Sequence, residues 1–349
     1  MTDAAQSYAL GDFSPPRVPT FENVTPELFA SEIQSARKPV VMKGVVRDWA
    51  VTRAAQESPQ ALASMLKRHA SQKLVSVNLK EPSTGERYFY KDGLKSCNFG
   101  RRSVRLAVVA DQLLQQMQQA APMGLYMDAA PAADLLPGFI QQHPMALAPQ
   151  DTEPRLWLGN SARVAPHFDV SENIACVVSG QRQFLVFPPE QVGNLYMGPL
   201  ENTPGGAPVS MVDPRDPDLG AYPKYAEAMR HAMLAKLEPG DAIYIPRLWW
   251  HYVEASGPFN LLVNYWWDSP AVSPMSGLIL AARTLRRLPE QDRAAMRAFF
   301  EHFVFSKDAD AAFDHIPEDA RGVMGPDTEA YDRVIQPILA SMISGALSE

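Results

Sequence analysis

Apolar side chains in the first 150 residues recur at two different spacings. Leu106, Val109 and Leu113 follow one another at three- and four-residue steps, which is typical of one buried helix face. Elsewhere short β-branched runs end at Gly or Pro, which is typical of strands. These patterns predict helices over 26–36, 60–69 and 103–120, and strands over 38–44, 74–78 and 87–90.

From residue 155 to 268 the pattern changes to short apolar runs separated by Gly, Pro, Asn and Asp. Strands that are this short, with turn residues between them, favour a sandwich or barrel over a βαβ sheet. We therefore predict a mainly β fold with flanking helices. The expected strands are 156–158, 174–178, 183–187, 242–245 and 260–266, and helical spacing returns over 274–288 and 290–303.

Composition narrows the function classes. The 349 residues have a net charge of -7, so no basic face is expected to displace phosphate counterions, and a nucleic-acid partner is not predicted. Cys97 and Cys176 are far apart, which argues against a disulfide framework or a thiolate zinc site and favours a reducing, cytoplasmic setting. No run of about 18 apolar residues predicts a membrane span, and the polar N-terminus does not read as a signal peptide.

One motif carries candidate metal chemistry. In Pro166-His167-Phe168-Asp169 two ligand types stand at i and i+2, which point to the same side of an extended chain end. His251, after the Pro-Gly-Asp turn and strand of 239–245, is the candidate third ligand. Two imidazoles and one carboxylate form the facial triad that suits Fe(II) and leaves positions open. The alternative makes His167 a polar strand end and His251 a hydrogen-bonded core histidine.

The surrounding segments carry a resemblance. HFDVSENIACVVSGQRQFLVFPPEQ, LEPGDAIYIPRLWWHYVE and LLVNYWWDSP occur in this order. They resemble the JmjC-like cupin oxygenases, and most closely the branch that contains the asparaginyl hydroxylase of hypoxia-inducible factor. The resemblance is dense over about 156–270 and thinner at 38–50 and 124–127. It implies a double-stranded β-helix (cupin, or jelly-roll) core that binds Fe(II) and 2-oxoglutarate and hydroxylates, or demethylates by hydroxylation, a side chain of a protein or a smaller molecule.

The resemblance also implies residue roles. The family's metal ligands fall on His167, Asp169 and His251. Its basic residue for the far carboxylate of 2-oxoglutarate, usually lysine, falls on Arg182, whose planar fork would bind a carboxylate side-on.

Three further positions match residues that line the family's pocket. Tyr126 falls on a tyrosine that hydrogen-bonds the same carboxylate, and Asn173 and Asn264 fall on asparagines of the pocket wall. A solvated strand arginine, a core tyrosine and a turn asparagine are the alternatives for Arg182, Tyr126 and Asn173. The family threonine before the first metal histidine is absent, since Ala165-Pro166 stands there.

These observations predict the domain organisation. Residues 1–20 are expected to form a loose arm, 21–270 a JmjC-like cupin domain with its core at about 155–270, and 271–349 a helical region that would serve as a homodimer element. The substrate is not decoded, and its specificity is expected in the loops 129–145 and 197–223. Two other functions remain: a metal-binding cupin that does not use 2-oxoglutarate, and a non-catalytic binding module.

Overall fold

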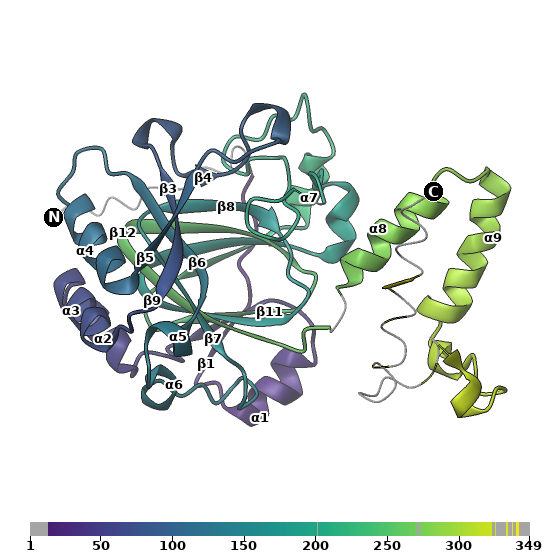
Figure 1. Ribbon diagram of the computed structural model, residues 1–349, viewed down its shortest axis with the longest axis horizontal. Coiled ribbons are helices and arrows are strands. Elements are labelled where there is room, and N and C mark those ends of the chain that lie inside the picture. The colour runs from purple at the N-terminus through teal and green to yellow at the C-terminus, as the bar shows by residue number, and fades with distance from the viewer. Residues whose placement is uncertain are drawn as a thin grey trace. The chain divides into compact units, whose positions relative to one another are not determined.

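The computed structural model describes residues 13–200, 202–270 and 273–322, together with residues 325, 333, 337, 340 and 341. The first 12 residues of the predicted arm and most of the chain after 322 lie outside this range. Among the described residues, a 12-stranded sheet forms the core (Figure 1). Its strands are β1 Thr20–Glu22, β2 Val40–Lys43, β3 Leu74–Lys80, β4 Arg87–Tyr88, β5 Gly100–Arg105, β6 Gly124–Pro131, β7 Pro154–Gly159, β8 Ala162–His167, β9 Glu172–Phe187, β10 Met233–Leu237, β11 Ala242–Ile245 and β12 Trp250–Trp267.

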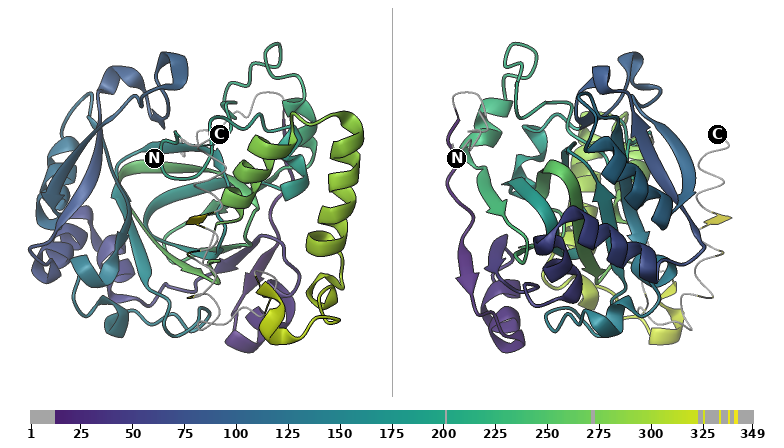
Figure 2. Two further views of the ribbon diagram at one scale, coloured as in Figure 1. Left: turned by 45° about the vertical axis from the view of Figure 1, so that its right-hand side comes forward. Right: turned by 90° about the vertical axis from the view of Figure 1, so that its left-hand side faces the viewer.

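Two long strands organise the sheet. β9 and β12 pair antiparallel along most of their length, β11 and β10 pair with β9, and β7 and β8 pair with β12. Both strands bend at a register shift, so each contributes to two stretches of sheet, as Figures 1 and 2 show. The predicted mainly β fold with flanking helices is confirmed, and the arrangement is consistent with a jelly-roll core.

The runs 174–178 and 183–187, predicted as separate strands, form one continuous strand, β9. Gly180 lies between them with a φ of +75°, a conformation that glycine adopts at little cost. A Cβ atom at this position would lie 1.9 Å from Asn260 Oδ1 of β12. The glycine therefore bends the strand pair without interrupting it. The sequence pattern alone indicates a turn at this position, which is why two separate strands were predicted.

Helices cover one side of the strands (Figure 2). Buried Val51, Leu62 and Val109 pack in the same cluster as Val178 and Val263 of the long strands. The helices of this first part are α1 Pro26–Leu28, which continues as a π-helical segment Phe29–Gln34, α2 Ala50–Glu57, α3 Pro59–His69, α4 Leu106–Gln116, α5 Ala132–Leu135, α6 Phe139–Gln142 and α7 Tyr225–Arg230.

The predicted helix 26–36 is confirmed by α1 and its continuation, and Thr25 caps it by accepting a hydrogen bond from the Leu28 amide at 3.2 Å. The predicted start of the helix at residue 103 was wrong, because α4 begins at Leu106. Ser103 to Arg105 instead pair with β3 as the end of β5. Backbone pairing with a distant strand overrode the local helical spacing there.

Backbone contacts divide the chain into Met1–Ser273 and Pro274–Glu349. The second unit contains α8 Pro274–Leu285 and α9 Glu290–Phe300, followed by a π-helical turn, Glu301–Phe305. No described residue of α8 or α9 is buried, and Phe299 and Phe305 expose more than half of their surface. The unit therefore presents apolar side chains on short helices.

Candidate metal centre and pocket

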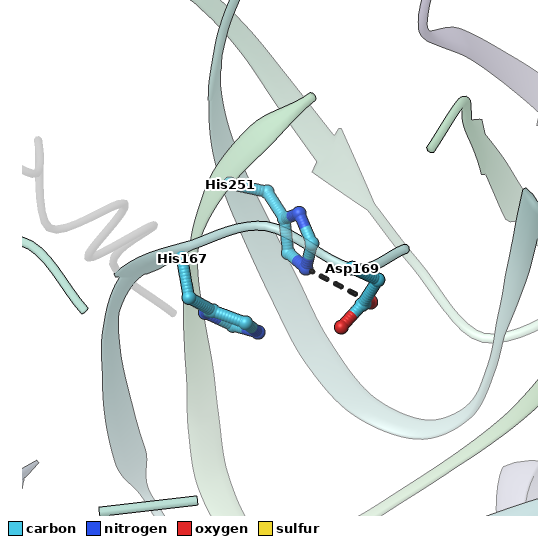
Figure 3. Close-up of side chains that lie close together, drawn as sticks. All are labelled: His167, Asp169 and His251. Atoms are coloured by element: carbon cyan, nitrogen blue, oxygen red, sulfur yellow. Dashed lines mark ion pairs between the residues drawn. The ribbon is translucent and has the colours of Figure 1, made fainter. Parts of the chain in front are cut away.

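Three side chains predicted as metal ligands converge at the end of β8. One ligand atom from each of His167, Asp169 and His251 lies within 4.8 Å of the other two. Figure 3 shows the three side chains gathered together. His251 Nε2 is 3.6 Å from Asp169 Oδ2. Antiparallel pairing of β8 and β12 sets His251 directly opposite His167, so the third ligand is positioned by strand register rather than by a loop.

Backbone carbonyls orient both imidazoles. His167 Nδ1 lies 2.9 Å from the Ala165 carbonyl oxygen, and His251 Nδ1 lies 3.0 Å from that of Trp249. If each Nδ1 carries the proton, each Nε2 keeps a lone pair for a metal ion. Burial, with a smaller contribution from nearby His167, lowers the pKa of His251 to about 4. This imidazole is therefore neutral at physiological pH, which is the form that binds a metal.

An unusual turn after β11 leads into the strand that carries His251. Leu248 adopts a φ of +69° and its amide donates a 2.7 Å hydrogen bond to the Asp169 carbonyl oxygen. A non-glycine residue in this region is uncommon and is tolerated where the surroundings hold it. The turn therefore ties the His251 strand to the His167–Asp169 segment at the backbone level.

The triad opens into a pocket of about 260 Å³. Its walls are mainly aromatic and aliphatic, and its charged lining residues are Asp128, Asp169 and Arg182. All seven residues that the sequence singled out line this pocket: His167, Asp169, His251, Arg182, Tyr126, Asn173 and Asn264. Arg182 is 4% exposed, so the alternative of a solvated arginine is wrong. Tyr126 lines the pocket and also packs in a buried cluster with Tyr88 and Ala162, so the alternative of a core tyrosine is not contradicted.

Arg182 is a buried cation without a carboxylate. It is 4% exposed, and its Nε and Nη2 atoms have no hydrogen-bond partner among the described residues. These two atoms form one edge of the guanidinium, the edge that binds a carboxylate side-on. Burial raises the pKa of Tyr126 to about 12, opposed by the charge of Arg182 and a hydrogen bond with it. Arg182 and Tyr126 therefore form one polar corner of the pocket.

The two asparagines belong to a second polar group. Trp157 Nε1 donates to Asn264 Oδ1 at 2.6 Å, and Asn264 Nδ2 donates to Asn173 Oδ1 at 3.3 Å. A polar side chain inside the apolar strand β12 requires such partners. The chain of hydrogen bonds fixes the orientation of both amides beside the metal ligands.

A segment after β9 forms the rim of the pocket. The Ser210 amide donates to the Pro166 carbonyl at 2.7 Å, next to His167, and Arg101 Nη2 donates to the Pro204 carbonyl at 3.1 Å. Pro204 and Val209 line the pocket. The predicted specificity loop 197–223 thus includes residues that contact the pocket directly.

Sequence reasoning missed several pocket residues, namely Asn78, Tyr88, Phe99, Asp128, Trp157 and Trp266. The i and i+2 relation of Tyr126 and Asp128 on β6 was a usable signal for one of them. Trp266 Nε1 is buried and has no partner among the described residues. Together with Nε and Nη2 of Arg182, it is a third unsatisfied donor on residues that line the pocket.

The outer face of the same strands carries a different polar cluster. Glu254 of β12 accepts a 3.0 Å hydrogen bond from Arg215 Nε and a 3.1 Å bond from the Tyr252 hydroxyl. Arg163 Nη1 lies 3.0 Å from both carboxylate oxygens of Asp213. This outer cluster is paired within itself.

No helix in the described residues is long and apolar enough to cross a membrane.

Comparison with known proteins finds relatives that match part of this chain. Over 118 residues the chain is 35% identical to human HSPB1-associated protein 1, covering 33% of this chain and 23% of that protein. It is 32% identical over 120 residues to the lysine-specific demethylase JMJ31 of Arabidopsis thaliana, covering 34% of this chain and 21% of the relative. The chain thus spans about a quarter or less of these relatives.

A longer match is the tRNA wybutosine-synthesizing protein 5 of Danio rerio, 27% identical over 72% of this chain and 74% of that protein. The family model described as "Cupin-like domain" matches residues 26–272, which include every strand from β2 to β12 and all three triad residues. The chain therefore belongs to the cupin-like domain family.

Proposed function

We propose that the chain is an Fe(II)- and 2-oxoglutarate-dependent oxygenase that hydroxylates a protein side chain or a small molecule and releases succinate and CO2. One observation carries the proposal: the converging His167, Asp169 and His251 share a pocket with Arg182, a buried cation whose side-on donors have no partner among the described residues. The first feature fits Fe(II), and the second fits the far carboxylate of a dicarboxylic acid.

The chain's own residues would act as follows. The triad would hold the metal by one face and leave the opposite positions for ligands. Arg182 and Tyr126 would fix the far carboxylate, and Asn173 and Asn264 would order polar groups near the metal. When bound, iron and 2-oxoglutarate would activate dioxygen, which is the oxidant for both the C–H bond of the substrate and the cosubstrate that becomes succinate and CO2. The apolar walls would exclude water from that step.

The assignment explains the departure from the family's usual lysine. Arg182 presents two parallel donors where a lysine presents one compact charge. It would therefore compensate for the hydrogen bond lost with the absent threonine before His167.

Resemblance to the asparaginyl hydroxylase branch supports hydroxylation. One relative is named a demethylase. Mass analysis of the product separates the two, since hydroxylation adds an oxygen atom and demethylation removes a methyl group.

The proposal extends to the cellular compartment and the oligomeric state of the protein. Two free cysteines support a cytoplasmic protein. Exposed Leu278, Phe299 and Phe305 of the second unit support a homodimer through its helices, which sedimentation velocity would test. One relative is named for tRNA, but a net charge of -7 disfavours nucleic acid here.

Anaerobic titration with Fe(II) and then 2-oxoglutarate tests the function. We expect a visible metal-to-ligand charge-transfer band with the unaltered chain and none with His167→Ala. His231→Ala, which changes an exposed histidine paired with Glu227, is the matched control and should keep the band.

The alternatives predict different results. Iron binding without the band would favour a cupin that does not use 2-oxoglutarate. A band without succinate formation, over a range of candidate substrates, would favour a binding module.

A further inference from the structure

Asp128 lies where the pocket meets a second hollow. It lines the metal pocket and also a groove of about 260 Å³ between β3 and β6. The register of β6 against β7 shifts between Met127 and Ala130, and Ala129 adopts a φ of +43°. A bulge of this kind re-aims a side chain. Here it places a carboxylate at the junction of both hollows.

A hydrogen-bond chain holds this carboxylate from one side. Asn78 Nδ2 donates to Asp128 Oδ2 at 3.2 Å, and Arg101 Nε donates to Asn78 Oδ1 at 3.2 Å. No ion pair joins Asp128 to a cation among the described residues. Asp134, which lines the same groove, differs because Lys73 pairs with it. Asp128 is therefore a positioned carboxylate with its charge uncompensated by direct contact.

The charges of the pocket favour a cation. Arg182 and Asp169 carry opposite charges, so Asp128 leaves the lining one negative charge in excess. A divalent metal and a dicarboxylate would bring charges that cancel each other. The aromatic rings of Phe99, Trp157 and the other wall residues add a surface that attracts cations.

The groove provides room for the rest of a substrate. β3 pairs with β6 only at Asn78 to Lys80, whereas Leu74 to Val77 pair with β5 alone. The two strands therefore separate from Asn78 toward Leu74. Residues of both strands line the groove between them, and the Lys73–Asp134 pair lines its far end.

We propose that Asp128 is a specificity-determining residue that selects a substrate with a cationic nitrogen group, an ammonium or a guanidinium. The cation binds the free side of the carboxylate, and the body of the substrate extends along the groove between β3 and β6. The inference rests on the proposed function for the reaction that follows, but substrate binding is measurable without turnover.

The test is calorimetric titration of the full chain, anaerobically, with and without Fe(II) and 2-oxoglutarate. The probes are capped lysine amide, capped arginine amide, cadaverine and the neutral capped norleucine amide. We expect at least one cationic probe to bind roughly tenfold tighter than norleucine amide, the margin of a partly buried ion pair with aromatic contacts. Asp128→Asn, which keeps an oxygen for Asn78, should abolish that margin. Asp111→Asn should retain it, because that carboxylate of helix α4 is paired with Lys67 and lines neither the pocket nor the groove.

Each outcome decides the matter. A preference for the capped amino acids over cadaverine identifies a basic side chain as the source, and the reverse identifies a free amine. Equal binding of norleucine and all cationic probes overturns the inference, as does a preference that survives Asp128→Asn. Loss of the charge-transfer band concerns the proposed function instead, and the titration without metal still tests Asp128.

Discussion

The buried charges on the two faces of the sheet at strand β12 differ in whether they are paired. On the outer face, Glu254 is 2% exposed and is paired with Arg215 and Tyr252. On the inner face, Arg182 of the adjacent strand β9, paired with Ala255, is similarly buried, but two of its donors have no partner among the described residues. Charges that are paired within the protein stabilise the fold, whereas a charge left unpaired costs free energy until a ligand arrives. The difference identifies the inner face as the one built to bind.

Of the substitutions that test this difference between the two faces, Arg182→Met should have the largest effect. We expect binding of 2-oxoglutarate to weaken roughly 100-fold, since a bidentate charge-assisted pair is lost. The stability of the ligand-free chain should stay the same or rise, because an uncompensated buried charge is removed. Calorimetric titration and urea unfolding measure the two quantities.

Arg182→Lys is the control for this substitution, since it keeps the charge and should recover part of the affinity. A clear loss of stability in Arg182→Met would mean that the inner arginine is structural after all.

Glu254→Gln should produce the converse result. Removing the charge of buried Glu254 weakens its contacts with Arg215 and Tyr252, and we expect the free energy of unfolding to fall by about 2 kcal/mol. The affinity for 2-oxoglutarate should not change, because Glu254 points away from the pocket. Urea midpoints give the stability, with Glu227→Gln, at a partly exposed position of helix α7, as a control that should show no measurable change. Reduced cosubstrate affinity with unchanged stability would contradict the comparison.

Lys80→Met should give the smallest effect and the one that depends on pH. Burial, with the nearby charges of Arg163 and Arg87, lowers the pKa of Lys80 to about 8. Its ammonium donates to the Arg87 carbonyl, which also accepts from Asn98. Because the folded pKa lies below the unfolded one, charging Lys80 costs stability below pH 8, and this cost disappears as the pH rises toward 10.5.

Lys80→Met should therefore stabilise the chain at pH 7, by on the order of 1–2 kcal/mol, and the gain should shrink above pH 8. Thermal unfolding at several pH values measures it. A gain that does not vary with pH would place its origin in packing.

The sequence predicted the candidate centre better than its surroundings, for a physical reason. His167 and Asp169 are two residues apart, so their common direction follows from strand geometry alone. Arg182, Tyr126 and the two asparagines were reached through resemblance, since nothing in their local pattern marks a pocket. Asp128 was missed because its direction depends on a bulge between β6 and β7, which is decided by long-range pairing.

The fold shows the same limit. Alternating apolar runs revealed most of the core strands, yet Gly180 read as a break and proved to be a bend. Ser103 to Arg105 read as helix and proved to be the end of a strand. In both cases the deciding contacts come from residues distant in sequence, Asn260 in the first and Leu74 to Ser76 in the second.

The position of His251 opposite His167 has a consequence for how the chain folds. A metal ion held by both would join segments separated by roughly 80 residues, including the whole rim of the pocket, much as a cross-link closes a long loop. Metal supply would then control more than catalysis. In a cell short of iron, this chain would be less resistant to unfolding and to proteases, so its abundance would follow the availability of its own cofactor.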